Sequence, residues 1–236
     1  MKPAIVIPVY NHAMVAGIIV RARALGLPII VVDDGSDEET RAVLAVIPDI
    51  VLLRHAKNQG KGAALVTGFT TAVALGYDAA LTIDADGQHQ PADGIKLLTV
   101  AADERALVVG VRHGMEDEHV PWSSRFGRGF SNFWVWACGG PWLSDSQSGF
   151  RLYPLPESLN LGVRARRYQF EVEILVLAKM AAKRGKEGGL TIKEAPISVI
   201  YQSKGQRISH FRPWLDFWRN TQTFSRLLWR RFIPGL

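Results

Sequence analysis

The sequence predicts an α/β fold in which a mainly parallel sheet has helices on both faces. Short apolar runs alternate with stretches of helical character along the first 110 residues. Repeated strand–helix–strand units of this kind place the strands parallel, because each helix returns the chain to the same end of the sheet. At 236 residues the chain is long enough to bury a full core, so we expect one domain with a C-terminal extension.

The predicted elements follow in chain order. The apolar runs that predict strands are Ala4–Ile7, Ile29–Val32, Ile50–Leu53, Ala79–Ile83 and Leu107–Gly110. The stretches that predict helices are residues 13–25, 37–46, 61–75 and 91–103. The polar segment 112–121 is expected to form a loop over the site, and the next helix is expected to begin near Ser124 and run to Trp142. Glu171 and Glu173 are expected to be structural residues at the start of a later helix.

The most informative feature is a pair of carboxylates, Asp84 and Asp86, directly after the fourth predicted strand. Where a strand passes into a loop the backbone turns, and both side chains can then face one polyanion. Hard cations such as Mg²⁺ and Mn²⁺ bind carboxylate oxygens and complete their coordination with phosphates and water. The pair therefore indicates a metal site, although acidic pairs after strands are also common as solvated turns or helix caps.

Polar side chains also follow the first two predicted strands. Tyr10 follows the first strand, and Asp33-Asp34-Gly35-Ser36 follows the second. In open α/β sheets ligands bind outside the carboxyl ends of the strands. We therefore expect Tyr10 to stack on a base and Asp34 to accept hydrogen bonds from a base or ribose. The alternative is a turn in which Asp34 to Ser36 caps the next helix.

Gly60-Lys61-Gly62 opens a predicted helix after a strand, but its spacing matches neither the dinucleotide-binding motif nor the P-loop, which disfavours both of those classes. Contact with a bound phosphate, which Lys61 would neutralise, and a tight turn that packs the helix are equally compatible with this segment. Arg125 and Arg128 offer forked donors to phosphates, or else a solvated basic helix face.

These segments resemble family 2 glycosyltransferases of the GT-A fold, and most of all their polyprenyl-phosphate (dolichyl-phosphate) mannosyltransferase-like branch. Six segments, spread over nearly the whole chain, have the order and spacing of that family: Ile7-Pro8-Val9-Tyr10-Asn11, Val32-Asp33-Asp34-Gly35-Ser36, Asn58-Gln59-Gly60-Lys61-Gly62, Asp84-Ala85-Asp86-Gly87-Gln88-His89, Asp145-Ser146-Gln147-Ser148-Gly149-Phe150-Arg151 and Ser203-Lys204. One departure is His12, where the family usually has an acidic residue, so the resemblance does not assign the donor contact at this position or the nucleotide of the donor.

The resemblance implies a role for each motif. Asp84, Asp86 and Gln88 would hold Mg²⁺ or Mn²⁺ on the diphosphate of a nucleotide-sugar donor. Asp145 would be the catalytic group nearest the nucleophile, together with Asp86. The donor would be bound by Pro8, Tyr10, Asp34, Lys61, Asp84, Ala85, Arg125 and Arg128. The acceptor or its phosphate would be bound by Gln147, Lys204 and Arg207.

The segment that begins at Asp145 also has a structural interpretation. In this alternative Asp145 caps a turn, Gly149 lets the strand bend and Phe150 fills the core. Arg151 is expected to pair with an acidic neighbour rather than to touch substrate.

The implied reaction is the inverting transfer of one sugar to a lipid-linked acceptor. A phosphate acceptor is largely ionised at neutral pH, because its second pKa is about 6. A hydroxyl acceptor would instead need Asp145 as a base. The tail segment Ile208-Ser209-His210-Phe211-Arg212-Pro213-Trp214 is also similar to glycosyltransferases encoded with aryl-polyene lipid pathways, which leaves both acceptor classes open.

Three other classes of function are weighed against this one. A sugar-1-phosphate nucleotidyltransferase would share the general sheet, but its Gly-rich signature is missing near the N-terminus. A catalytically silent membrane scaffold would tolerate loss of the carboxylates. A nucleic-acid binder would bring a recognised binding fold, and none accompanies the charge, so nucleic acid is not expected as a partner.

The basic charge of the chain is concentrated in its last 34 residues. Segment 203–236 has seven basic residues against Asp216, which accounts for the whole net charge of +6. Its aromatic and basic residues recur near helical spacing, which predicts amphipathic helices at an anionic membrane surface, where each basic residue adds up to about 1 kcal/mol. The alternative is a helix that packs on the catalytic domain. We expect a catalytic domain over 1–202 and a membrane-interface extension over 203–236.

Compartment and membrane topology are predicted from the remaining features. The single cysteine, Cys138, excludes an internal disulfide and fits a reducing compartment. The start of the chain predicts no signal peptide, and the absence of a long apolar run predicts no spanning helix. We therefore expect a cytoplasmic protein, peripheral on the membrane, of undetermined oligomeric state. Of the first four tryptophans, Trp122, Trp134, Trp136 and Trp142, at least half are expected in the core, and the other tryptophans are expected to line an acceptor groove.

Overall fold

A computed structural model describes residues 1–12, 14–102, 104–112, 122–185, 189–198 and 213–232, with the backbone alone at 122–127, 213–219 and 232. Within these residues seven strands form one sheet, in the order β3-β2-β1-β4-β6-β5-β7. The strands are β1 (Pro3–Val9), β2 (Ile29–Asp33), β3 (Val51–Arg54), β4 (Ala79–Thr82), β5 (Ala106–Arg112), β6 (Arg151–Pro154) and β7 (Thr191–Ile197). Only β6 runs antiparallel to its neighbours in the described sheet, so the predicted mainly parallel α/β fold is confirmed.

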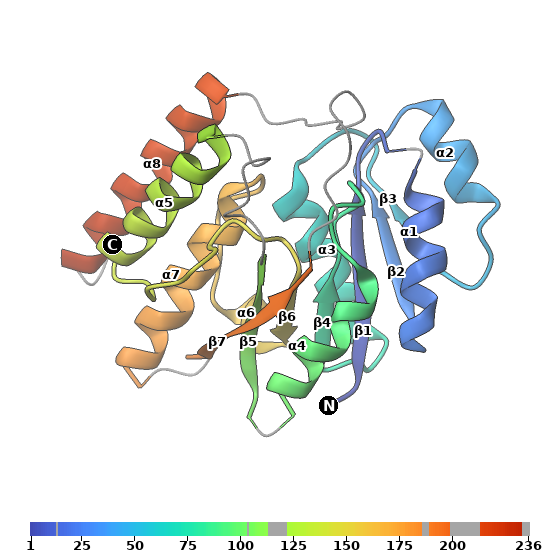
Figure 1. The fold of residues 1–236 in the computed structure, drawn as a ribbon. Coiled ribbons are helices and arrows are strands. Elements are labelled where there is room, and N and C mark those ends of the chain that lie inside the picture. The colour runs from blue at the N-terminus through green and yellow to red at the C-terminus, as the bar shows by residue number, and fades with distance from the viewer. Residues whose placement is uncertain (13, 103, 113–121, 186–188, 199–212, 233–236) are drawn as a thin grey trace.

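Helices cover both faces of this sheet (Figure 1). On one face lie α1 (Val15–Ala22), α2 (Glu38–Ala45) and α4 (Gly94–Val100), and on the other lie α3 (Lys61–Ala74), α5 (Trp122–Ala137), α7 (Gln169–Lys183) and α8 (Pro213–Phe232). Shorter elements are α6 (Glu157–Asn160), η1 (Arg23–Leu25) and η2 (Pro91–Asp93).

The alternation of side chains along β1 divides the core into two layers. Ala4 and Val6 face the layer that includes α3 and α7, whereas Ile5 and Ile7 face the layer that includes α1 and α4. All four side chains are fully buried. A strand that is covered on both faces needs apolar residues at consecutive positions, which is why these strands appear as continuous apolar runs in the sequence.

Two helix ends differ from the expected positions. The helix expected to reach Trp142 ends at Ala137, and Gly139 then adopts a left-handed conformation with φ +92°, which stops the helix. Helix α2 is capped by Asp37, whose side chain accepts a hydrogen bond from the Thr40 amide at 3.0 Å. The Asp34–Ser36 segment therefore forms the turn before the cap and not the cap itself.

Helix α8, the described part of the predicted C-terminal extension, packs on α7 and α5. Phe224 and Leu227 are buried in the layer that includes α7, and the Phe224 ring stacks on Trp134 with 5.8 Å between centroids. Arg226 Nη2 lies 2.8 Å from Oε1 of the buried Glu173. The apolar face of α8 at these positions is thus covered by protein. The boundary at residue 202 stays a prediction, because it falls outside the described residues. No helix in the described ranges has the length and hydropathy of a membrane span.

Candidate functional site

The polar strand ends predicted from the sequence meet at one edge of the sheet. Strand β1 pairs with β2 on one side and with β4 on the other, and all three are parallel. Tyr10, Asp34 and Asp84 therefore follow neighbouring strands at their carboxyl ends. Strands β2 and β3 lie on one side of β1 in the sheet and β4 lies on the other, so the strand order reverses at β1. Open α/β sheets bind ligands at the carboxyl ends of the strands where the order reverses.

Asp34 organises the loop that leads into α3. Its carboxylate is buried and accepts hydrogen bonds from His55 Nδ1 at 2.7 Å, from the Gln59 amide at 2.8 Å and from the Gly60 amide at 2.7 Å. Gly35, with φ +76°, allows this loop to approach closely, because a side chain there would lie 2.6 Å from the Lys57 carbonyl carbon. The expected contact of Asp34 with a base or ribose stays a prediction, and the structure adds a loop-forming role.

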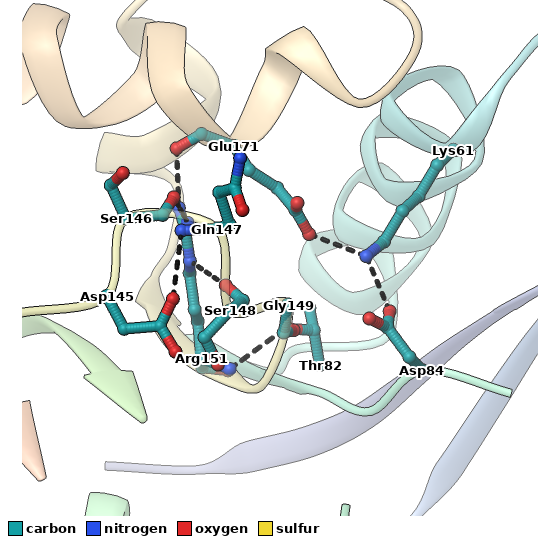
Figure 2. Close-up of polar contacts among 10 residues, drawn as sticks. All are labelled: Lys61, Thr82, Asp84, Asp145, Ser146, Gln147, Ser148, Gly149, Arg151 and Glu171. Carbon is teal, nitrogen blue, oxygen red and sulfur yellow. Dashed lines mark hydrogen bonds and ion pairs between the residues drawn. The ribbon is translucent and has the colours of Figure 1, made fainter. Parts of the chain in front are cut away.

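Lys61 joins two acidic side chains from distant parts of the chain (Figure 2). Its Nζ lies 2.6 Å from Asp84 Oδ1 and 2.6 Å from Glu171 Oε1. Burial alone would lower the pKa of Lys61, but the two carboxylates outweigh it and raise the pKa above the ordinary value. Burial opposes the charge of Asp84 as well, and Lys61 nevertheless holds the pKa of Asp84 below its usual range. Lys61 and Asp84 are therefore both charged at neutral pH.

Gly149 provides the space for this ion cluster. A Cβ at position 149 would collide with Asp84 Oδ2 and would lie 2.5 Å from Lys61 Nζ and 2.7 Å from Glu171 Oε1. The Gly149 carbonyl accepts a 2.7 Å hydrogen bond from Thr82 Oγ1 at the end of β4. The loop before β6 is thus fixed against the cluster, and glycine is the residue that fits there.

Arg151 fixes the same loop from inside the core. Its buried guanidinium donates to the carbonyl oxygens of Ser148 at 2.7 Å, Glu171 at 2.6 Å and Ser146 at 2.8 Å. The expected acidic partner is thus replaced by backbone carbonyls, which satisfy a planar fork of donors equally well. Phe150 is fully buried, as expected.

Asp145 is fully buried and forms a two-pronged ion pair with Arg112 at the end of β5. Arg112 Nε lies 2.6 Å from Asp145 Oδ2, and Arg112 Nη2 lies 2.9 Å from Asp145 Oδ1. The Gln147 amide donates to Asp145 Oδ1 at 3.3 Å, so the expected turn is also present. Both carboxylate oxygens of Asp145 are therefore engaged within the protein, while the Gln147 side chain is exposed.

The segment after β4 leaves Asp86 partly exposed. Its Oδ1 accepts a 3.0 Å hydrogen bond from the Gln88 amide. His89 is buried, its ring centroid lies 5.4 Å from that of Phe150, and burial lowers its pKa so that it is neutral at pH 7. No group of three or more acidic, histidine or cysteine side chains suited to a metal occurs among the described residues. This donor set fits a Mg²⁺ or Mn²⁺ ion that takes one or two carboxylates and obtains its other ligands from phosphates and water.

The other residues predicted to belong to the site lie in the following places. Pro8 lies inside β1, Ala85 is buried, and Tyr10 and Arg128 are partly exposed. The side chain of Arg125, and all of Lys204 and Arg207, lie outside the described residues, as does the expected loop at 113–121. The individual ligand and donor roles stay predictions.

Two site residues were missed by the sequence reasoning. Glu171 was interpreted as structural, and Arg112 was assigned only to the loop over the site. Glu171 contacts a residue 110 positions away in the sequence, and Arg112 contacts one 33 positions away. No local sequence pattern signals pairings over such separations. The nearest signal is the acidic first turn of α7.

Comparison with known proteins agrees with this geometry. The model of glycosyl transferase family 2 matches residues 4–155. The chain belongs to this family. As a family 2 glycosyltransferase it is 30% identical over 220 residues to the UDP-N-acetylglucosamine–dolichyl-phosphate N-acetylglucosaminyltransferase of Methanococcus voltae, covering 84% of this chain and 85% of that protein. It is 27% identical to the undecaprenyl-phosphate mannosyltransferase of Micrococcus luteus, covering 87% of this chain and 86% of that protein.

Solved structures support the fold of this glycosyltransferase. The crystal structure of S. aureus TarS 1–349 matches 97% of the chain and 66% of its own length with a TM-score of 0.55 at 15% identity. A nucleotidyl transferase from Methanothermobacter thermautotroptrophicus matches 95% of the chain and 98% of its own with a TM-score of 0.51, also at 15% identity. These likenesses show the α/β fold alone, and the family rests on the sequence match over residues 4–155.

Proposed function

We propose that this glycosyltransferase moves one sugar from a nucleotide-sugar donor to the phosphate of a polyprenyl phosphate. The observation that favours a phosphate acceptor is the engagement of Asp145. Both of its oxygens are held by Arg112, so it is poorly placed to take a proton from a hydroxyl. A phosphate monoester needs no such base, because with a second pKa of about 6 it is already ionised at neutral pH. The relatives named for dolichyl and undecaprenyl phosphate point the same way.

The donor is proposed to bind at the strand ends of β1, β2 and β4. A Mg²⁺ or Mn²⁺ ion held by Asp86, with Asp84 and Gln88, would offset the negative charge of the departing diphosphate. Lys61 keeps Asp84 ionised and in place, while Asp34 and Gly35 fix the loop that precedes α3. The acceptor oxygen attacks the anomeric carbon from the face opposite the diphosphate, which inverts the configuration.

The site of action is proposed to be the cytoplasmic face of a membrane, with the protein bound peripherally. The net charge of +6 suits an anionic leaflet, and the single cysteine, which is buried, suits a reducing compartment. The lipid acceptor itself requires that the enzyme reach the membrane surface.

Mass spectrometry of lipid products tests this function. The purified chain is given a panel of sugar nucleotides, membranes that contain polyprenyl phosphate, and Mg²⁺ or Mn²⁺. We expect one donor to yield a polyprenyl phosphate heavier by one sugar, with release of a nucleoside phosphate and loss of product on chelation. Asp86→Asn should keep the melting temperature and lose the product. Release of pyrophosphate would instead identify a nucleotidyltransferase, and no product with any donor would argue for a silent scaffold.

A further inference from the structure

The outer side of α5, together with Trp142 in the segment that follows the helix, has a row of aromatic side chains that face solvent. Phe133, Trp136 and Trp142 are 47%, 52% and 69% exposed, and Phe130 begins the row one helical turn earlier. Ring centroids of Phe133 and Trp136 are 6.2 Å apart, and those of Trp136 and Trp142 are 6.1 Å apart. We call these four residues the aromatic ridge. Soluble proteins rarely expose contiguous aromatic surface of this kind unless something covers it.

A basic group lies at the C-terminal end of the aromatic ridge. Arg231 of α8 donates to the carbonyl oxygen of Ala137, the last residue of α5, so its guanidinium lies beside the position that follows Trp136. Tryptophan and arginine together are the residues that proteins place at the boundary between headgroups and acyl chains.

The inner side of the same helix holds the loop that contains Asp145. Asn132 donates from Nδ2 to the Ser144 carbonyl at 3.0 Å and accepts at Oδ1 from the Ser146 amide at 2.9 Å. Ser131 Oγ and Ser146 Oγ are 2.9 Å apart. One helix therefore separates the exposed aromatic ridge from the loop of the predicted acceptor side.

Helix α8 packs beside α5 (Figure 1). Its apolar residues Phe224 and Leu227 are buried against the domain, and Arg226 pairs with Glu173. The described part of α8 thus buries the face that holds Phe224 and Leu227 and exposes one aromatic side chain, Trp229, whereas the aromatic ridge presents four aromatic side chains to solvent. The bilayer contact expected from the C-terminal sequence is better supplied by α5.

We propose that the aromatic ridge of α5 is the membrane-docking surface of the enzyme, inserted at the headgroup level of a bilayer that contains anionic lipid, with α8 as its internal support. The proposal rests on the proposed function, because a lipid-linked acceptor gives this surface its purpose. Docking through α5 brings the Asp145 loop, directly behind the helix, to the membrane surface where an acceptor phosphate lies.

Vesicle binding tests the ridge independently of catalysis. The double variant Trp136→Ala with Trp142→Ala is compared with wild type by co-sedimentation with vesicles of phosphatidylcholine and phosphatidylglycerol, without acceptor lipid. We expect the partition coefficient to fall by about tenfold or more, because two large interfacial side chains are removed. The matched control, Val46→Ala with Ile95→Ala, removes exposed apolar groups from the other side of the sheet and should bind like wild type.

Four further outcomes decide between the proposal and its alternatives. Unchanged melting temperature and unchanged turnover of a short, water-soluble prenyl phosphate would show that the double variant lost docking alone, as expected. Vesicle binding by the double variant equal to wild type would overturn the proposal. A wild-type dimer that the double variant converts to a monomer, with vesicle binding intact, would overturn it too and would make a second copy the occupant. Failure of sugar transfer by a wild type that still docks through the ridge would refute the proposed function and not the ridge.

Discussion

Lys61 Nζ and Asp84 Oδ1 lie 2.6 Å apart and join the first turn of α3 to the loop after β4. Glu171 completes the cluster from the first turn of α7. Three elements distant in sequence thus position one of the two carboxylates that we propose to face the donor diphosphate. This cluster gives Asp84 an ionised, fixed side chain before any ligand binds, which is the preorganisation that electrostatic catalysis requires.

Replacing Lys61 by Met should destabilise the protein and impair transfer. The substitution leaves Asp84 and Glu171 buried together without a cation, and breaking a buried pair costs about 3–5 kcal/mol, with the lower end expected because both Lys61 and Asp84 side chains are slightly exposed. Chemical denaturation at pH 7 measures this loss. An unchanged midpoint would show that the cluster does not stabilise the fold.

The same variant gives a prediction for pH. The folded-state pKa of Asp84 is lowered and that of Lys61 is raised, so the pair contributes fully between about pH 4 and pH 10, the ordinary values for the two groups. That contribution is lost as pH falls through the lowered pKa of Asp84. In Lys61→Met, Asp84 lacks the cation that opposes its burial, so it takes up a proton at higher pH than in wild type and the variant is then less destabilised. The stability gap between wild type and Lys61→Met should therefore be widest near neutral pH and narrow as pH falls toward and below pH 4. A gap that widens in acid would contradict this assignment.

Gly149→Ala should abolish most activity, because the added Cβ collides with Asp84 and crowds Lys61 and Glu171. The three atoms are the ends of flexible side chains, so the fold can accommodate the methyl group at little cost in stability, but only by displacing the ion cluster. Gly17→Ala is the control, because nothing lies within 4 Å of a Cβ at that helical position. Initial rates and melting temperatures of both variants decide the matter. Wild-type turnover by Gly149→Ala would show that the cluster does not position the site.

The Asp145–Arg112 pair is tested by a double-mutant cycle. Asp145→Asn, Arg112→Gln and the double variant should show a coupling free energy above about 1 kcal/mol in unfolding, because each side chain uses two contacts on the other. The single variant Asp145→Asn also tests the acceptor. If the acceptor is a phosphate, this variant should retain measurable turnover. A loss of roughly 10²- to 10⁴-fold, with the acid limb of the pH profile abolished, would instead identify Asp145 as a general base.

Arg226→Glu should lower the stability of the packed C-terminal helix, and not only weaken membrane binding. The reversal places a carboxylate beside the fully buried Glu173 and costs about 2 kcal/mol, less than for a buried pair because a third of the Arg226 side chain is exposed. In a chain of this size the melting temperature should fall by roughly 4–8 °C. Arg21→Glu, at an exposed end of α1, should leave it nearly unchanged.

Much of the fold could be predicted because its determinants are local. The ends of β1 and β2 predicted from the apolar runs lie within two residues of the observed ends. Strands buried on both faces need consecutive apolar side chains, which is why the runs mark them. The end of α5 was missed, because Gly139 stops the helix while apolar residues continue to Trp142. At least half of the first four tryptophans were expected in the core: Trp134 packs against it, Trp136 and Trp142 are more than half exposed, and the side chain of Trp122 lies outside the described residues, so this expectation stays a prediction.

The candidate site was predictable in its residues and not in its contacts. The strand-end motifs placed Asp84, Asp34 and Lys61 together because parallel strands end at one edge. The partners of these residues are set by tertiary packing. Asp145 meets Arg112 through the sheet order β6-β5, and Lys61 meets Glu171 through the contact of α3 with α7. Neither pairing is encoded at a fixed spacing.

The central claim is that the acceptor oxygen belongs to a lipid phosphate. The most direct measurement gives the enzyme its donor with a polyprenyl phosphate or with the polyprenol of the same chain length, under identical metal and detergent, and follows product by mass spectrometry. We predict a glycosylated product from the polyprenyl phosphate and none from the polyprenol. Transfer to the polyprenol hydroxyl, with the polyprenyl phosphate left unmodified, would contradict this account.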